Sequence, residues 1–114
     1  AVIAYAVGQH VPVIAGAFTP TEVYAAWSAG ATMVKVFPCG ALGPRYIREL
    51  RGPFDRIPLV AVGGVRADNV GDYFAAGARA VGVGASLFGR QALAQRSPAV
   101  IGAHVRQFLE KVPQ

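Results

Sequence analysis

A lysine in an apolar strand is the residue of this sequence with the clearest potential for chemistry. Lys35 lies within the apolar run Thr32–Pro38, and the chain has only one other lysine. Side chains alternate along a strand, so Met33, Lys35 and Phe37 share one face and the intervening valines take the other. An apolar setting disfavours the ammonium form and leaves a free amine to attack a carbonyl carbon. The alternative is a lysine whose stem packs in the sheet while its amine reaches water.

Two glycine-rich turns provide the second chemical signal. Gly63 and Gly64 end one apolar run, and Gly84 and Ser86 end the next. Glycine lets backbone N–H groups approach an anion, a helix N-terminus expected near Ala67 adds partial positive charge, and the serine adds a hydroxyl donor. We therefore predict that these two turns form a phosphate site. The alternative is that small residues only permit tight turns.

These residues need a scaffold of alternating strands and helices. Runs near residues 11–16, 32–37, 57–62 and 80–84 are apolar on both faces, which is typical of parallel strands covered by helices. Glycines precede the runs one βα unit apart, and two of these joints share the letters Ala-Gly-Ala, at residues 29–31 and 76–78. The sequence therefore predicts repeated βα units.

Helix start signals fall between the runs. Thr19 is expected to cap a helix with Pro20 at its first position and Glu22 completing a capping box. Further helices are expected to start at Pro44, within residues 66–68, and at Pro98, the last continuing to about residue 112.

Four βα units amount to half of a (β/α)8 TIM barrel, whose full length is roughly 250 residues. We predict that residues 1–114 are one α/β segment, the C-terminal half of such a barrel, with parallel strands and the N-terminal half absent. Residues 1–8 resemble the middle of a helix with no cap before it. Alone, the half sheet would leave two edges unpaired, so the isolated chain is expected to be oligomeric or aggregation-prone.

Composition excludes several classes of protein. The chain has 114 residues, of which 54% are hydrophobic and 15% charged, so its apolar surface must be buried. No apolar run approaches the roughly 20 residues of a membrane helix, and no signal peptide is visible. The single Cys39 excludes an internal disulfide and fits the reducing cytoplasm. The net charge of +5 is scattered, which argues against nucleic acid and suits an anionic substrate.

The combined motifs resemble one enzyme family. The motifs are Val-Lys-Val-Phe-Pro-Cys-Gly-Ala-Leu-Gly at residues 34–43, Ala-Val-Gly-Gly-Val at 61–65 and Val-Gly-Ala-Ser at 83–86. Together they resemble the 2-dehydro-3-deoxy-phosphogluconate / 4-hydroxy-2-oxoglutarate aldolase family over essentially the whole chain.

The resemblance implies a class I aldolase on a (β/α)8 barrel, usually a cytoplasmic homotrimer. Its substrate is a phosphorylated 2-keto-3-deoxy sugar acid, cleaved to pyruvate and glyceraldehyde 3-phosphate. Some members also cleave 4-hydroxy-2-oxoglutarate to pyruvate and glyoxylate. Lys35 matches the imine-forming lysine, Phe37 lines its pocket, and Gly63, Gly64 and Ser86 match phosphate-binding positions. No metal or cofactor is implied.

Two features of the family pattern differ or are missing here. The family's proton-moving glutamate on the second strand and its carboxylate-binding arginine have no counterpart in this chain. Every acidic residue is expected on helices or loops away from the carboxyl ends of strands. Val62 stands where members often have threonine, so the pocket wall lacks a hydroxyl. This leaves C4 stereospecificity open and favours the galactonate-type enzyme or a promiscuous one.

Other side chains receive structural interpretations. Cys39 is expected to be a small filler rather than a catalytic thiol, because neither histidine is placed to activate it. Arg45, Arg48 and Arg51 are expected on a solvated helix face, and Arg66 is expected to be exposed, with a phosphate contact as the alternative. The aromatic residues Tyr24 and Trp27 are expected to pack against the barrel wall or a neighbouring subunit.

Two other classes of function remain open. One is another phosphate-binding barrel enzyme, such as an epimerase or a thiamin-phosphate-type synthase, which would form no covalent adduct at Lys35. The other is an inactive truncated fragment that persists only in a partner-stabilised or domain-swapped assembly.

Overall fold

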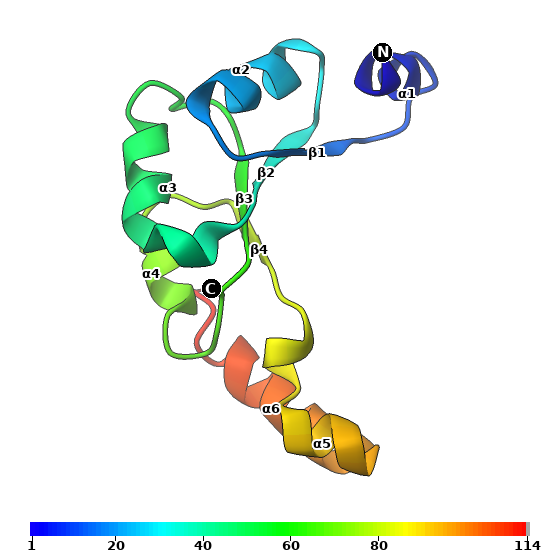
Figure 1. Ribbon diagram of the computed structural model, residues 1–114, viewed down its shortest axis with the longest axis vertical. Coiled ribbons are helices and arrows are strands. Elements are labelled where there is room, and N and C mark those ends of the chain that lie inside the picture. Colours follow the sequence, from blue (N-terminus) through cyan, green and yellow to red (C-terminus); the bar gives the residue numbers. More distant parts are fainter. Residues whose placement is uncertain (114) are drawn as a thin grey trace.

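The computed structural model describes residues 1–113 and contains one four-stranded parallel sheet (Figure 1). Its strands lie in chain order: β1 (Ile14–Ala17), β2 (Met33–Val36), β3 (Leu59–Val62) and β4 (Ala80–Gly82). The helices are α1 (Val2–Gly8), α2 (Pro20–Ser28), α3 (Gly43–Arg51), α4 (Val70–Ala75), α5 (Arg90–Gln95) and α6 (Pro98–Leu109). Short 3-10 turns, η1 (Cys39–Ala41) and η2 (Ala85–Leu87), follow β2 and β4. The predicted α/β class and parallel strands are confirmed.

All four strands lie where the sequence predicts them, but they are shorter. The first begins only at Ile14, because the Val13 N–H donates to the Thr32 side-chain hydroxyl at 3.1 Å instead of to the backbone of β2. The last ends at Gly82, where the chain turns away toward η2. The register pairs Gly16 with Lys35 and Lys35 with Val60, so these residues lie on one face of the sheet.

The core lies between the sheet and the helices on one side of it. Figure 1 shows α2, α3 and α4 along this side, whereas α5 and α6 form a pair beyond the end of β4. Val34, Val36 and Leu59 point into the core and are fully buried. The predicted alternation along β2 is therefore confirmed, and the face that carries Lys35 is not covered by these helices.

A complete capping box starts α2, as predicted. The Thr19 hydroxyl accepts from the Glu22 N–H at 3.3 Å, and the Glu22 carboxylate accepts from the Thr19 and Phe18 N–H groups, each at 2.8 Å. These backbone donors, Thr19 first, hold the pKa of Glu22 below its ordinary value. These local hydrogen bonds therefore fix where the loop after β1 ends and α2 begins.

The two Ala-Gly-Ala joints have the same structure. Gly30 and Gly77 have φ angles of 95° and 101°, which only glycine adopts readily. In each joint the glycine N–H donates three residues back and the following alanine N–H donates five residues back. The predicted repeat therefore reflects one hydrogen-bonding pattern that ends a helix and starts a strand.

Two helix expectations need correction. The helix expected within residues 66–68 begins only at Val70, because the Asn69 side chain accepts from the Arg66 N–H at 2.8 Å and closes a turn first. The final helix starts at Pro98 as predicted but ends at Leu109, and the sequence did not signal the short α5 before it. Within residues 1–113, no helix has both the length and the apolar character needed to cross a membrane.

Replacing Glu22 with glutamine tests the charge of the capping box. Glu22→Gln keeps the shape and an acceptor oxygen but removes the charge that the two N–H groups stabilise. Because the folded pKa lies below the unfolded value, this stabilisation is present above the unfolded pKa and is lost as the pH falls through the folded pKa. We expect a lower melting temperature than wild type at pH 7 and convergence of the two proteins in the acid range. A difference that stays constant with pH would contradict this account.

Candidate active site

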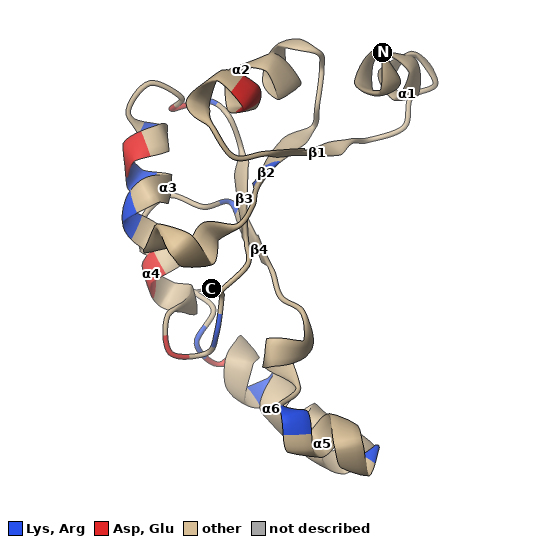
Figure 2. Ribbon diagram, viewed as in Figure 1, with Lys and Arg blue, Asp and Glu red and all other residues tan. Residues whose placement is uncertain are grey.

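Lys35 is the one charged residue within the four described strands (Figure 2). Its half-buried side chain lies on the helix-free face of the sheet, and its Nζ lies 5.3 Å from the centroid of the Phe37 ring. This distance is within the range of a cation–π contact. Within residues 1–113, the ion pairs are Arg45–Glu49 and Arg66–Asp68, so no carboxylate holds the Lys35 amine. The amine is therefore placed to meet an incoming molecule.

The remaining predicted site residues line one cavity of about 260 Å³ at the carboxyl ends of β3 and β4. Its lining includes Phe37, Val62, Gly63, Gly64, Gly84 and Ser86. The structure thus brings together six predicted residues from three separate segments, with Lys35 adjacent through the Phe37 ring.

The two turns at this cavity, Gly63–Gly64 and Gly84–Ser86, are called the cradle below. Phe37 contacts its first glycine, Gly63. A Cβ added at Gly63, whose φ is 90°, would lie 3.2 Å from Phe37 Cε2 and 3.4 Å from the Cys39 backbone nitrogen. Gly63 therefore has a packing role in addition to its predicted phosphate role. The ring of Phe37 forms the boundary between the amine of Lys35 and the cradle.

The loops that follow β2 and β3 meet backbone to backbone. A Cβ at Gly64, whose φ is 71°, would lie 2.5 Å from Gly40 Cα, closer than real Cβ contacts come. Gly84 is different: a Cβ there would meet nothing within 4 Å. Of these cradle glycines, Gly64 is required by the fold and Gly84 is not.

Asn69 supports this turn, a role that is not among those predicted from the sequence. Its Nδ2 donates to the Gly64 carbonyl at 3.0 Å, while its Oδ1 accepts from Arg66 N–H. The signal was present, because asparagine commonly closes such turns through its side chain. Since the helix starts only after Asn69 and is six residues long, the expected helix N-terminus at the cradle is wrong. The N–H groups of the turns themselves are the available donors.

Cys39 is buried directly behind the site. Its Sγ donates to the Val36 carbonyl at 3.1 Å, and burial raises the pKa of the thiol. The buried Tyr73 hydroxyl lies 3.5 Å from the Cys39 carbonyl, and burial likewise raises the pKa of this phenol. Both observations fit the predicted structural role of Cys39 and disfavour a catalytic thiolate.

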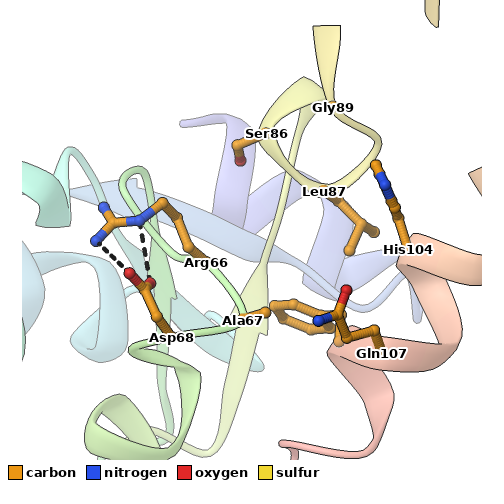
Figure 3. A pocket seen from close by; sticks show the side chains of 9 residues that line it. Arg66, Ala67, Asp68, Ser86, Leu87, Gly89, His104 and Gln107 are labelled. Atoms are coloured by element: carbon orange, nitrogen blue, oxygen red, sulfur yellow. Dashed lines mark hydrogen bonds and ion pairs between the residues drawn. The ribbon is translucent and has the colours of Figure 1, made fainter. Parts of the chain in front are cut away.

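Arg66 lies exposed beside the Gly64 turn, and its Nη1 donates to the Gly64 carbonyl at 3.5 Å. It pairs with Asp68 at 3.1 Å and lines a second hollow of about 300 Å³, together with His104 and Gln107 (Figure 3). The predicted exposure of Arg66 is confirmed, and its ion pair leaves less charge for a phosphate. Ser86 lies between the two hollows and lines both.

The other structural expectations are confirmed only in part. Arg45 pairs with Glu49 at 3.5 Å on an exposed helix face. Arg51 differs, because its guanidinium donates to the carbonyls of Phe54 and Ile57 and ties down the loop before β3. Tyr24 is 60% exposed and stacks on Phe54, so it does not pack into the barrel wall.

One acidic residue lies closer to a strand end than expected. The sequence predicts Glu22 on a helix away from the carboxyl ends of strands, but its carboxylate accepts from the N–H of Phe18, the residue directly after β1. It remains committed to the capping box, and its lowered pKa disfavours the protonated form.

Comparison with known proteins decides the family. Residues 1–103 match the family model for KDPG and KHG aldolase. The chain belongs to this aldolase family. The predicted resemblance is therefore confirmed.

Relatives of this aldolase chain are about twice as long. It is 37% identical to the 2-dehydro-3-deoxy-6-phosphogalactonate aldolase of Escherichia coli strain K12, over 97% of this chain and 55% of that protein. It is 44% identical to a probable enzyme of the same name from Rhizobium meliloti strain 1021, over 77% and 42% of the two chains. The chain thus spans about half the length of the curated relatives it matches.

A solved structure described as native KDPGal matches with a TM-score of 0.79 and 35% identity, over 96% of this chain and 54% of that one. This match confirms that the four βα units correspond to a fragment of a (β/α)8 aldolase fold.

The two cradle glycines give a paired stability test. We expect Gly64→Ala to lower the free energy of unfolding by at least about 2 kcal/mol, because the methyl group meets the Gly40 backbone at a positive φ. Gly84→Ala should change it by less than about 0.5 kcal/mol, since the added group meets no atom. Denaturant unfolding of both variants checks this, and equal effects would contradict the described approach of the two loops.

Proposed function

We propose that this chain carries the imine-forming and phosphate-binding part of a class I aldolase, a carbon–carbon lyase. Its substrate class is the 2-keto-3-deoxy-6-phospho sugar acids, cleaved to pyruvate and glyceraldehyde 3-phosphate. The observation that supports this most is the cavity at the ends of β3 and β4, whose lining collects six predicted residues beside Lys35.

The chemistry begins with the Lys35 amine. Its lone pair attacks the C2 keto carbon, and loss of water gives a protonated imine. The bond between C3 and C4 then breaks, and its electron pair moves into the imine to give an enamine. The C4 hydroxyl loses its proton and becomes the aldehyde of glyceraldehyde 3-phosphate. Protonation at C3 and hydrolysis release pyruvate and restore the amine.

The face of the Phe37 ring supports the charged steps. With Nζ 5.3 Å from the ring centroid, the negative face of the ring stabilises the positive charge of the protonated imine once it has formed on this nitrogen. Gly63 makes this arrangement possible, because a side chain there would displace the ring.

The two turns hold the phosphate end. Backbone N–H groups near Gly63, Gly64 and Gly84 and the hydroxyl of Ser86 are donors for an anion in a cavity without a carboxylate lining. Val62 adds an apolar wall. The two relatives described above are named as galactonate-type aldolases, and position 62 lacks the hydroxyl. The galactonate-type acid is therefore our first candidate, with the gluconate-type acid and 4-hydroxy-2-oxoglutarate as further substrates.

The proton of the C4 hydroxyl needs a base. The family resemblance implies a glutamate from a part of the barrel that these 114 residues do not include. Glu22 is unsuited to the task, because its carboxylate is held by two backbone N–H groups. We also propose a homotrimer in the cytoplasm, as the resemblance implies; the buried free thiol of Cys39 fits a reducing compartment.

Trapping the imine tests the role of Lys35. Incubation with pyruvate and borohydride is expected to give a reduced adduct that peptide mass mapping places at Lys35, because, of the two lysines, this one lies beside the cavity. Lys35→Ala should abolish the adduct, and the control Lys111→Ala should leave it intact. An adduct found at Lys111 instead, or none at all, would favour the non-covalent enzymes such as an epimerase or synthase.

Gly84→Val tests the phosphate end without disturbing Phe37, which a change at Gly63 would do. The isopropyl group should fill the cradle and raise the half-saturating concentration for trapping 2-dehydro-3-deoxy-6-phosphogalactonate by roughly tenfold, while that for pyruvate changes less than about twofold. Gly8→Ala, at another site where a Cβ meets nothing, is the matched control. An equal rise for both compounds would show that Gly84 does not serve the phosphate.

A further inference from the structure

Gly16 lies directly beside the candidate nucleophile. It is paired with Lys35 in the register of β1 and β2, so both residues face the open side of the sheet. A Cβ added at Gly16 would meet only Lys35 Cε, at 3.7 Å, which is an ordinary contact. Its φ lies outside the positive region that favours glycine. Nothing in the described fold therefore requires glycine at this position.

A glycine inside a strand weakens the strand relative to alanine, because it loses more backbone entropy and packs no side chain. Gly40, Gly63 and Gly64 each relieve a close contact that a side chain would create, but Gly16 relieves none. Its missing side chain leaves open space beside the stem of Lys35 instead. This space is open to part of a bound substrate.

The order of the strands determines which part of a substrate lies next to Gly16. Gly16 is on β1, Lys35 on β2, and the two turns of the cradle follow β3 and β4. Neighbouring strands lie about 4.8 Å apart, so the cradle is on one side of Lys35 and Gly16 is on the other. A linear substrate with its phosphate in the cradle and C2 at Lys35 extends its longer arm toward β3. The group on the opposite side of C2, the C1 carboxylate, then lies over Gly16.

We propose that Gly16 is a specificity-determining residue that admits the C1 carboxylate of 2-oxo acids beside Lys35. This inference deepens the proposed function and rests on imine formation at Lys35. It assigns the two ends of the substrate to opposite sides of the lysine: Gly16 receives the carboxylate end, and the cradle receives the phosphate end. A side chain at position 16 narrows the space for the carboxylate end of the substrate but not for its phosphate end.

Pyruvate and acetaldehyde form a matched pair of probes, because acetaldehyde has a hydrogen where pyruvate has its carboxylate. Borohydride trapping with each compound is measured on wild type, Gly16→Ala and Gly16→Val, counting only the adduct mapped to Lys35. We expect Gly16→Val to raise the half-saturating pyruvate concentration by roughly tenfold or more and that of acetaldehyde by less than about twofold, with Gly16→Ala between wild type and valine. Gly8→Ala serves as the control, and thermal unfolding verifies that each variant is folded.

The outcomes separate the two proposals. If Gly16→Val raised the half-saturating concentrations of both probes equally, position 16 would act on Lys35 itself. If the half-saturating pyruvate concentration stayed unchanged, the carboxylate would lie elsewhere. Either result overturns the assignment to Gly16 while the imine chemistry stands. Absence of any Lys35 adduct in the wild-type protein would overturn the proposed function and this inference with it.

Discussion

The close approach of two loops is the constraint on which the site depends. A Cβ at Gly64 would lie only 2.5 Å from Gly40 Cα, and one at Gly40 would lie 3.2 Å from Gly64 Cα, so the backbones of the loops after β2 and β3 pack tightly together. This contact holds Phe37 against Gly63 and fixes where Lys35 stands relative to the cradle. The positions of the nucleophile and the anion donors are therefore set by backbone packing, and Asn69 secures the second loop through the Gly64 carbonyl.

Elements with strong local signals were predictable from the sequence. The capping box at Thr19, the two glycine joints and the alternation along β2 each depend on interactions within a few residues, and the structure confirms them. The meeting of the two glycine-rich turns was also predictable from the sequence, because the carboxyl ends of neighbouring parallel strands lie at the same edge of a sheet. These features rest on local geometry or on general topology.

What the sequence did not reveal depends on contacts between distant segments. The requirement for glycine at position 64 comes from Gly40, and the packing role of Gly63 comes from Phe37, neither of which is a sequence neighbour. The helix α4 starts late because the Asn69 side chain bonds to the Arg66 N–H and the Gly64 carbonyl, which closes a turn instead of capping a helix. Arg51 left its expected solvated face because unsatisfied carbonyls of the next loop lay within reach.

The identical joints at Gly30 and Gly77 lie where helices lead into strands, whereas the candidate site lies where strands lead into helices. The residues that end these helices and start the next strands therefore lie at the opposite end of the βα units from the candidate reactive groups. Substitutions in the strand-to-helix loops can therefore alter the substrate while the joints at the opposite end keep the βα units packed together, a division of roles that is general to (β/α)8 barrels.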